Sequence, residues 1–150
     1  MAPTFVPSSG GSLPQGALCV AFEAFKGGPQ GNHLFVARVN HEGSLIPGKF
    51  HERNSVAYIP YGGQELNYTD NYEVLTGGGL FWVEAKNGEL PEGAFQAGHK
   101  ANGDPLYVAK AKINGADAVG KFNPKLGFAQ IPYFGKAHEA RNYAVLVQKD

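Results

Sequence analysis

The pentapeptide Leu-Phe-Val-Ala-Arg at residues 34–38 returns as Leu-Tyr-Val-Ala-Lys at residues 106–110, which is 72 positions further along the chain (106 − 34). Each copy is a run of branched and aromatic side chains that ends in a base, which is typical of a β-strand. Two more pairs of blocks keep this spacing: Gly-Lys-Phe at residues 48–50 and 120–122, and Ile-Pro-Tyr at residues 59–61 and 131–133. The ordered recurrence indicates an internal repeat.

Two outer pairs of blocks extend the repeat with offsets of 77 and 71: Leu-Pro-x-Gly-Ala at residues 13–17 and 90–94, and Asn-Tyr-x-Val-Leu at residues 71–75 and 142–146. The change of offset from 77 to 72 places a five-residue insertion (77 − 72) within residues 22–32 of the first copy. We therefore expect a single domain over residues 1–150, with repeat 1 at about 11–76 and repeat 2 at about 80–149. The Gly-rich link between the repeats is too short for two independent units.

Short runs rich in branched and aromatic residues follow one another along both copies, and no long stretch shows helical periodicity. The expected strands cover residues 33–39, 55–61, 72–76, 80–85, 105–111, 127–133 and 143–148. With 21 Gly and 10 Pro to form turns, this pattern is typical of an all-β protein. We expect two tandem antiparallel β repeats of four or five strands each, related by a pseudo-twofold axis and packed as a sandwich or flattened barrel.

The charged residues balance, 13 against 13, so the formal net charge is zero. This balance argues against nucleic acid or an anionic membrane as the main partner, because both attract a surplus of Lys and Arg. The single cysteine, Cys19, lies in an apolar run and is expected to be a buried small hydrophobe. The first residues show no secretory signal, and no apolar run is long enough for a membrane span. We expect a cytoplasmic protein, with release by a non-classical route as an alternative.

Taken together, the repeated blocks resemble the DM-nine repeat family, whose pattern is also found in natterin-like proteins. The resemblance rests on residues 34–38, His-Glu-Gly at 41–43, Ile-Pro-Gly-Lys at 46–49, residues 57–63 and 72–75, and in the second copy on Trp82 and residues 90–94, 106–110 and 120–121. It implies a homodimeric lectin that recognises mannose-type glycans in innate immune or damage recognition. It implies no metal and no cofactor.

The resemblance also implies which residues hold the sugar, namely a Lys in the Pro-Gly-Lys block and an Asp in the loop before the Leu-Tyr-Val strand. The Lys corresponds to Lys49 in the first copy and to Lys121 in the second. The place of the Asp falls on Lys100 in the second copy. In the first copy it falls on Glu23 or on Gly28, depending on which side of it the insertion lies.

A lysine beside a carboxylate supplies both the donors and the acceptors that sugar hydroxyls need. The glycine before each lysine allows a close backbone approach, and we expect both Gly-Lys pairs to lie in exposed turns. Glu42 or Glu23 is expected to supply the carboxylate beside Lys49. In the second copy Lys121 faces Lys100 instead, so we expect that site to bind neutral sugar less well or to prefer an acidic sugar.

Arg38 and Lys110 recur at the end of the repeated strand. The favoured interpretation is an outward charge or a structural ion pair, for Arg38 with Glu42 or Glu73, and the alternative is a contact to the sugar. These two positions therefore complete the candidate carbohydrate-binding set without deciding its function.

The five histidines do not fall at zinc-ligand spacing, and no carboxylate pair or nucleophile–base set stands out. We therefore expect neither a metal site nor an enzyme. Tyr61 and Tyr133 recur beside proline near strand ends. We expect them to be core or interface rings, and the alternative is an exposed ring that stacks on the apolar face of a sugar. The alternative to a lectin is a non-catalytic structural or adaptor protein on the same scaffold, without sugar binding.

Overall fold

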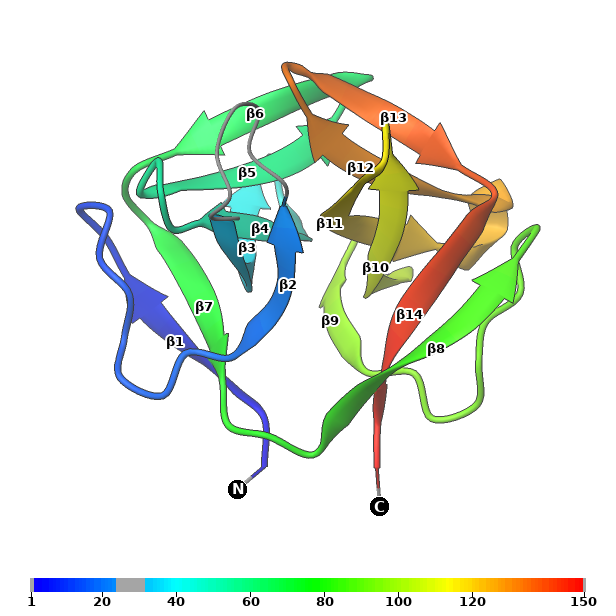
Figure 1. Cartoon of the computed structure of the whole chain (residues 1–150), viewed down its shortest axis with the longest axis horizontal. Helices are drawn as coiled ribbons and strands as arrows, with labels where there is room; N and C mark the ends of the chain where they lie inside the picture. The colour runs from blue at the N-terminus through cyan, green and yellow to red at the C-terminus, as the bar shows by residue number, and fades with distance from the viewer. Residues whose placement is uncertain (1, 24–31, 150) are drawn as a thin grey trace.

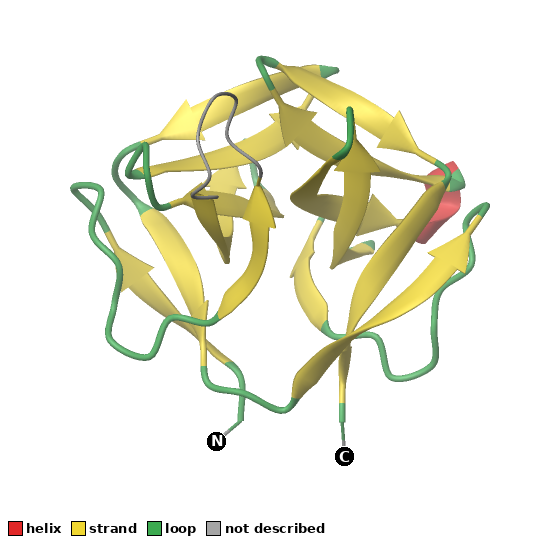
Figure 2. Cartoon of the chain, viewed as in Figure 1, coloured by secondary structure: helices red, strands yellow, loops and turns green. Residues whose placement is uncertain are grey.

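The computed structural model describes residues 2–23 and 32–149 and consists almost entirely of β-strands (Figure 2). The first repeat forms β1 (Thr4–Ser8), β2 (Cys19–Glu23), β3 (Asn32–His41), β4 (Ser44–His51), β5 (Val56–Tyr61), β6 (Gln64–Tyr68) and β7 (Tyr72–Thr76). The second forms β8 (Leu80–Lys86), β9 (Gln96–His99), β10 (Pro105–Ile113), β11 (Ala116–Asn123), β12 (Phe128–Tyr133), β13 (Lys136–Ala140) and β14 (Asn142–Gln148), with a 3₁₀ turn, η1 (Pro124–Leu126), before β12. The all-β prediction is confirmed. None of the described segments is a helix with the length and apolar character needed to cross a bilayer.

Every strand pairing within the first repeat has a counterpart within the second. The pairs β1–β7, β2–β3, β3–β4, β3–β7, β4–β5 and β5–β6 correspond to β8–β14, β9–β10, β10–β11, β10–β14, β11–β12 and β12–β13. Figure 1 shows the two halves side by side, with both termini at the same end. Each half holds seven described strands, not four or five, and β1 begins before residue 11, where the repeat was expected to start.

The two repeats are joined along one seam and form a continuous sheet. Strands β6 and β13 pair through Gln64 and Lys136, and backbone hydrogen bonds extend the contact from Glu65 N to Gly135 O (3.2 Å) and from Ala137 N to Gly63 O (3.1 Å). Strand β9 of the second repeat also pairs with β4 of the first. The halves are therefore parts of one sheet and not beads on a linker.

Three hydrophobic clusters fill the described part of the molecule. One lies inside the first repeat around Phe50 and Tyr72, and the second lies inside the other repeat around Phe122 and Tyr143. The third lies between the repeats and draws on both: Ala21, Leu34, Val36, Leu75, Ala97, Val108, Val119 and Leu146. Successive strand residues point to opposite faces, so β3 and β10 each supply an inner cluster and the shared one. This double burial explains the unbroken apolar runs at residues 34–37 and 106–109.

The recurring Gly-Lys-Phe block lies inside β4 and β11, so the prediction of exposed turns was wrong. A Cβ atom on Gly48 would lie 2.1 Å from the carbonyl oxygen of Tyr58, and one on Gly120 would lie 2.2 Å from that of Gln130. Glycine is required at both places because the neighbouring strand passes so close. The block recurs for a packing reason, and the lysine that follows is held in a strand.

Cys19 is exposed at the start of β2, so the prediction of a buried thiol was wrong. The register between β2 and β3 shifts between Cys19 and Ala21, which marks a bulge. A bulge changes the direction of the side chains around it. The Cys19 thiol therefore points outward and donates to the carbonyl oxygen of Ala21 at 3.5 Å.

Candidate functional site

Lys49 lies within β4, across from Val36 of β3 and Tyr58 of β5. Only 2% of its surface is exposed, and its Nζ lies 3.8 Å from Oε2 of Glu65, whose side chain is 11% exposed. A lysine is rarely this buried unless it is paired. The contact with Glu65 is therefore part of what allows a charge at this position.

The surroundings of the Lys49–Glu65 pair come from both repeats. The rings of Tyr58 and Tyr133 lie 5.7 and 5.4 Å from Lys49 Nζ, within the range of a cation–π interaction. Glu65 Oε1 accepts a hydrogen bond of 2.9 Å from the backbone N–H of Gly135. Since Tyr133 and Gly135 belong to the second repeat, the pair holds the two repeats together. Tyr133 itself is 6% exposed, which fits the core or interface role favoured from the sequence and not the alternative of an exposed stacking ring.

Lys121 takes the matching position in β11, but its surroundings differ. In the first repeat Glu65 stands opposite Pro60, and in the second the residue opposite Pro132 is Ala137. The second repeat therefore has no counterpart of the Glu65 carboxylate at this place.

Burial, together with the smaller effect of the positive charge of nearby Lys100, lowers the pKa of Lys121 to about 8. Both effects penalise the charged ammonium. An acceptor oxygen placed beside Lys121 would relieve this penalty, because a hydrogen bond to the charged form favours that form. The second repeat thus holds two amines that repel each other, and it lacks the carboxylate that pairs with Lys49 in the first repeat.

Lys100 opens the loop between β9 and β10, and the loop is closed by its own backbone. Lys100 N donates to Asp104 O at 2.8 Å, and Gly103 N donates to Lys100 O at 2.8 Å. Sequence reasoning missed the carboxylate of Asp104, which stands directly before Pro105. A hydrogen bond from Lys125 lowers the pKa of Asp104, and the Lys125 Nζ lies 2.8 Å from its Oδ1. The loop therefore contains a carboxylate, that of Asp104, but this carboxylate already forms an ion pair with Lys125.

Glu42 does not supply the carboxylate beside Lys49, so that prediction was wrong. It lies in the tight turn between β3 and β4 with a positive φ of 52°, and its carboxylate is 2.9 Å from His41 Nε2. Lys49 lies near the other end of β4, several residues along the hairpin. Glu65 is a carboxylate beside Lys49 that the sequence analysis missed, because three strands must pair before it meets Lys49.

Glu23 is the last residue of β2 and stands opposite Asn32 of β3. Gly28, the other position inferred for the acidic residue of the first copy, lies outside the described residues. The choice between these two positions therefore stays open, and Lys49 and Glu65 are the described charges of the first-repeat site.

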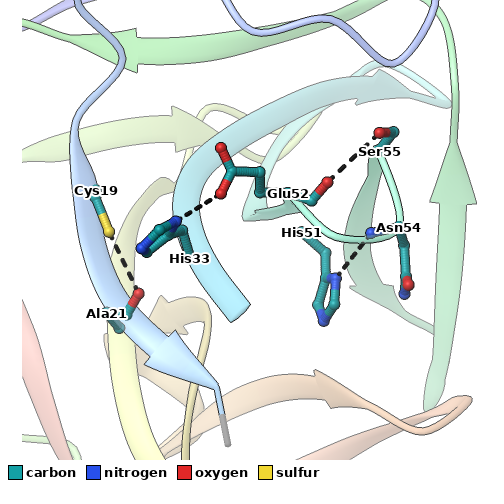
Figure 3. A network of polar contacts seen from close by, with 7 residues as sticks. All are labelled: Cys19, Ala21, His33, His51, Glu52, Asn54 and Ser55. Atoms are coloured by element: carbon teal, nitrogen blue, oxygen red, sulfur yellow. Dashed lines mark hydrogen bonds and ion pairs between the residues drawn. The ribbon is translucent and has the colours of Figure 1, made fainter. Parts of the chain in front are cut away.

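Figure 3 shows the polar groups around the turn between β4 and β5. His33 Nδ1 and Glu52 Oε1 lie 2.6 Å apart. The backbone N–H of Asn54 donates to His51 Nδ1 at 3.3 Å, and its side-chain amide donates to the hydroxyl of Tyr58 at 3.0 Å. Because Tyr58 also contributes the ring beside the β4 lysine, this turn holds one wall of the first-repeat site in place.

Arg38 is used within the fold. Its Nε lies 2.6 Å from Glu73 Oε1, its Nη1 donates to the carbonyl oxygen of Ala97 at 3.1 Å, and its guanidinium lies 3.8 Å from the centroid of the Phe5 ring. Glu73 is one of the two ion-pair partners considered from the sequence. With its donors engaged in this way, Arg38 lies apart from the strand lysines and makes a structural contact between the repeats.

Within residues 2–23 and 32–149, no three His, Cys, Asp or Glu side chains lie close enough together to hold a metal ion. The cationic pair of Lys100 and Lys121 suits an organic ligand with acceptor oxygens, because ammonium groups only donate hydrogen bonds. A sugar hydroxyl or a sugar carboxylate has this character.

A sequence model described as the DM9 repeat matches residues 2–66 and 27–140. Among solved structures, the nematode sperm cell motility protein MFP2B is similar, with a TM-score of 0.67 at 16% sequence identity. The similarity covers 99% of this chain and 45% of that one, so this chain spans under half of that protein's length. At this identity the likeness shows the fold alone. The search of curated proteins finds no match.

Proposed function

The chain belongs to the DM9 repeat family, and from that premise we propose that it is a lectin-like protein that binds carbohydrate and catalyses no reaction. One observation carries the proposal: both repeats place a lysine, Lys49 or Lys121, at the same strand position and withdraw it from bulk water. Packing explains the glycine that precedes each lysine but does not require the lysine itself. Burying a charged lysine is costly, and both repeats have one at the same position. A ligand that binds the lysine explains this better than packing does.

The second repeat is the better candidate for the ligand-bearing site. Lys49 is almost fully enclosed and has Glu65 as a partner, whereas Lys121 is half-buried, lacks that partner and has a pKa lowered to about 8. Hydrogen bonds from a charged donor to ligand oxygens stabilise a complex by roughly 1.5–3 kcal/mol. A mannose-type glycan presents paired hydroxyls as acceptors, and a sugar acid adds a charge that complements Lys100.

Calorimetric titration with methyl α-D-mannopyranoside and with D-glucuronate tests this proposal. Replacing Lys121 by Met keeps the length of the side chain and removes the donor, so we expect affinity to fall about ten-fold to a hundred-fold. Lys149→Met, at an exposed residue near the end of β14, is the matched control and is expected to bind as the wild type does. Equal binding by all three proteins, or no binding of either sugar at millimolar concentration, would rule the proposal out.

A non-catalytic structural or adaptor role is the second candidate, and the Lys49–Glu65 pair favours it. This pair joins the repeats without any ligand, and a protein of similar fold is described as a sperm cell motility protein. If no sugar binds, while Lys49→Met lowers the melting temperature and Lys121→Met does not, the lysines serve the scaffold alone.

The biological setting is part of the same proposal. From the family resemblance we infer a homodimer that recognises mannose-type glycans in innate immunity or damage sensing. The cytoplasmic location is proposed from the sequence of the first residues and the single cysteine. The zero net charge supports self-association, because it leaves little electrostatic repulsion between copies. Paired sites would raise the avidity of a weak sugar contact. Light scattering at micromolar concentration checks the dimer, and a monomer there would contradict it.

A further inference from the structure

Strands β8, β14 and β10 are neighbours in the second repeat (Figure 1). A groove of about 920 Å³ is lined by residues of these strands. Ala144 of β14 stands opposite Glu84 of β8 on one side and opposite Lys110 of β10 on the other. Residues that face each other across strands point to the same side of the sheet. Glu84 and Lys110 therefore flank Ala144 on one side of the sheet, and their backbones lie about 10 Å apart, two strand spacings.

The first repeat closes the same row with an ion pair. There Glu73 of β7 stands between Pro7 of β1 and Arg38 of β3. Glu73 binds Arg38 at 2.6 Å, directly over the middle strand. The second repeat has Ala144 in place of this glutamate and moves the carboxylate one strand outward, to Glu84. Arg38 and Glu73 form an ion pair in the first repeat. In the second repeat, Ala144 stands between Lys110 and Glu84, and these two side chains form no ion pair.

The two repeats also differ in the residue that donates a side-chain hydrogen bond to the other repeat. This residue is Arg38 in the first repeat and Trp82 in the second. In the first repeat Arg38 donates to the carbonyl oxygen of Ala97 at 3.1 Å. In the second, the Trp82 indole donates to the carbonyl oxygen of Val20 at 3.0 Å. Val20 and Ala97 hold matching places in β2 and β9, so the cross-repeat hydrogen bond is kept while its donor has changed.

This exchange leaves the ammonium of Lys110 available in the groove. Its Nζ lies 4.9 Å from the centroid of the Trp82 ring, which holds it in place by a cation–π contact. Among the described residues, no carboxylate or carbonyl oxygen lies within hydrogen-bonding distance of Lys110 Nζ. No hydrogen-bond donor of the described residues binds the Glu84 carboxylate. A positioned donor and an acceptor thus face each other without a partner.

We propose that this groove is a second carbohydrate-binding site, which holds one neutral hexopyranose residue between Glu84 and Lys110 with its ring over Ala144. Four carboxylates and four basic side chains line the groove, so its net charge is zero and favours a neutral ligand over an ion. Sugar hydroxyls both donate and accept hydrogen bonds, so one residue can satisfy the Glu84 carboxylate and the Lys110 ammonium together. Glu84 accepts from one hydroxyl, and Lys110 donates to another.

This site shares its ligand class with the proposed function but none of its residues. Loss of binding at Lys121 and loss of binding in the groove are therefore separate results. The chain has a single tryptophan, Trp82, so its indole N–H resonance and its fluorescence report on the groove. Calorimetry of Lys121→Met reports on the strand lysine.

The test is a titration with methyl α-D-mannopyranoside and methyl β-D-glucopyranoside, followed by the Trp82 indole resonance. We expect a saturable shift in the wild type and in Lys121→Met. Ala144→Glu rebuilds the ion pair of the first repeat across the groove, and we expect it to abolish the shift. Lys110→Met, which leaves the middle strand unchanged, is expected to weaken binding about ten-fold if Ala144→Glu does not fold. Lys149→Met is the control for loss of an unrelated lysine.

Three results would overturn the proposal. They are the absence of a Trp82 shift with both sugars, an unchanged shift in Ala144→Glu and Lys110→Met, and a shift with the zwitterion glycylglycine but not with the sugars. The last result would assign the groove to a ligand with separated charges.

Discussion

The two repeats share one topology and differ in how they treat their cations. In the first, Lys49 has Glu65 and Arg38 has Glu73 as a partner. At the two positions that match these glutamates the second repeat has alanine, Ala137 and Ala144. The first repeat is therefore closed by its own charges. The second has the corresponding lysines, Lys121 and Lys110, and among the described residues no carboxylate forms an ion pair with either.

This difference shows how a duplicated scaffold can divide its tasks. Ion pairs in the first repeat hold the seam and the shared core together. The second repeat relies on the same seam, so its own matching positions need not contribute to it. A buried or half-buried ammonium without a carboxylate costs stability, and a ligand with acceptor oxygens recovers part of that cost.

The largest effect on stability is expected from breaking the Lys49–Glu65 ion pair of the first repeat. Glu65→Ala leaves Lys49 as a buried charge without its carboxylate, so we expect the free energy of unfolding to fall by about 3–5 kcal/mol. For a chain of this size that corresponds to a melting temperature about 10 °C lower. Chemical and thermal denaturation followed by circular dichroism measure it.

The control for Glu65→Ala is Lys49→Met combined with Glu65→Ala, which removes both charges. We expect the double variant to regain part of the lost stability, because replacing a whole buried pair costs much less than breaking it. A single variant as stable as the wild type would show that the pair does not hold the seam.

The next effect concerns how the stability of the protein depends on pH through Lys121 of the second repeat. The pKa of Lys121 in the folded protein is lowered to about 8 from 10.5, so the unfolded chain binds more protons between these values. Stability from this group therefore rises as the pH increases from about 8 towards 10.5, by about 1–3 kcal/mol after allowance for water screening. In Lys121→Met this rise should be absent, and the difference between the two unfolding curves isolates it from tyrosine ionisation.

The pKa of Lys121 can be changed by giving the second repeat the carboxylate that the first repeat has. Ala137→Glu places a carboxylate where Glu65 stands in the first repeat, so we expect it to raise the pKa of Lys121 towards its usual range. The stability gain between pH 8 and 10.5 should then shrink. An unchanged pH profile would mean that position 137 does not face Lys121.

Much of this organisation could be predicted from the sequence, and the reason is the recurrence of blocks. Four of the five blocks lie in matching strands, and the Leu-Pro-x-Gly-Ala block lies in the loop before β2 and before β9. The order of the blocks therefore predicted the tandem all-β repeats. Strands β6 and β13 escaped because Gln64–Tyr68 and Lys136–Ala140 are short and largely polar. They are edge strands of each repeat that gain their stability by pairing with each other at the seam.

The site was less predictable because its contacts depend on pairing across several strands. Lys49 and Lys121 stand out in the sequence, but the Gly-Lys spacing suggests a turn when read without the neighbouring strand. The close carbonyl oxygens of β5 and β12 make the glycine a packing requirement. Glu65 and Ala137 look unrelated until the two repeats are aligned strand by strand, and this alignment could have been made from the sequence with β6 and β13 known.

A smaller effect is expected from the contact that Arg38 makes between the repeats. Arg38→Lys keeps the charge but loses the planar group that reaches Glu73 and the carbonyl oxygen of Ala97 together. We expect a loss of about 1–2 kcal/mol in the free energy of unfolding. The reverse change in the second repeat, Lys110→Arg, is the matched control and should alter stability by less than about 0.5 kcal/mol. Equal losses in both variants would contradict the difference between the repeats.

The smallest effect is expected at Glu42, the acid that the sequence placed beside Lys49. Its side chain is 67% exposed, and its contact with His41 lies at the tip of the β3–β4 hairpin. Glu42 also has a φ of 52°, a left-handed conformation that asparagine tolerates better than glutamate does. Glu42→Asn should therefore change the free energy of unfolding by less than about 0.5 kcal/mol, in the stabilising direction if at all. Sugar affinity should stay the same, because no described contact links Glu42 to either strand lysine. A loss of sugar binding in Glu42→Asn, measured by the same calorimetric titration, would move the site to the hairpin tip and away from Lys121.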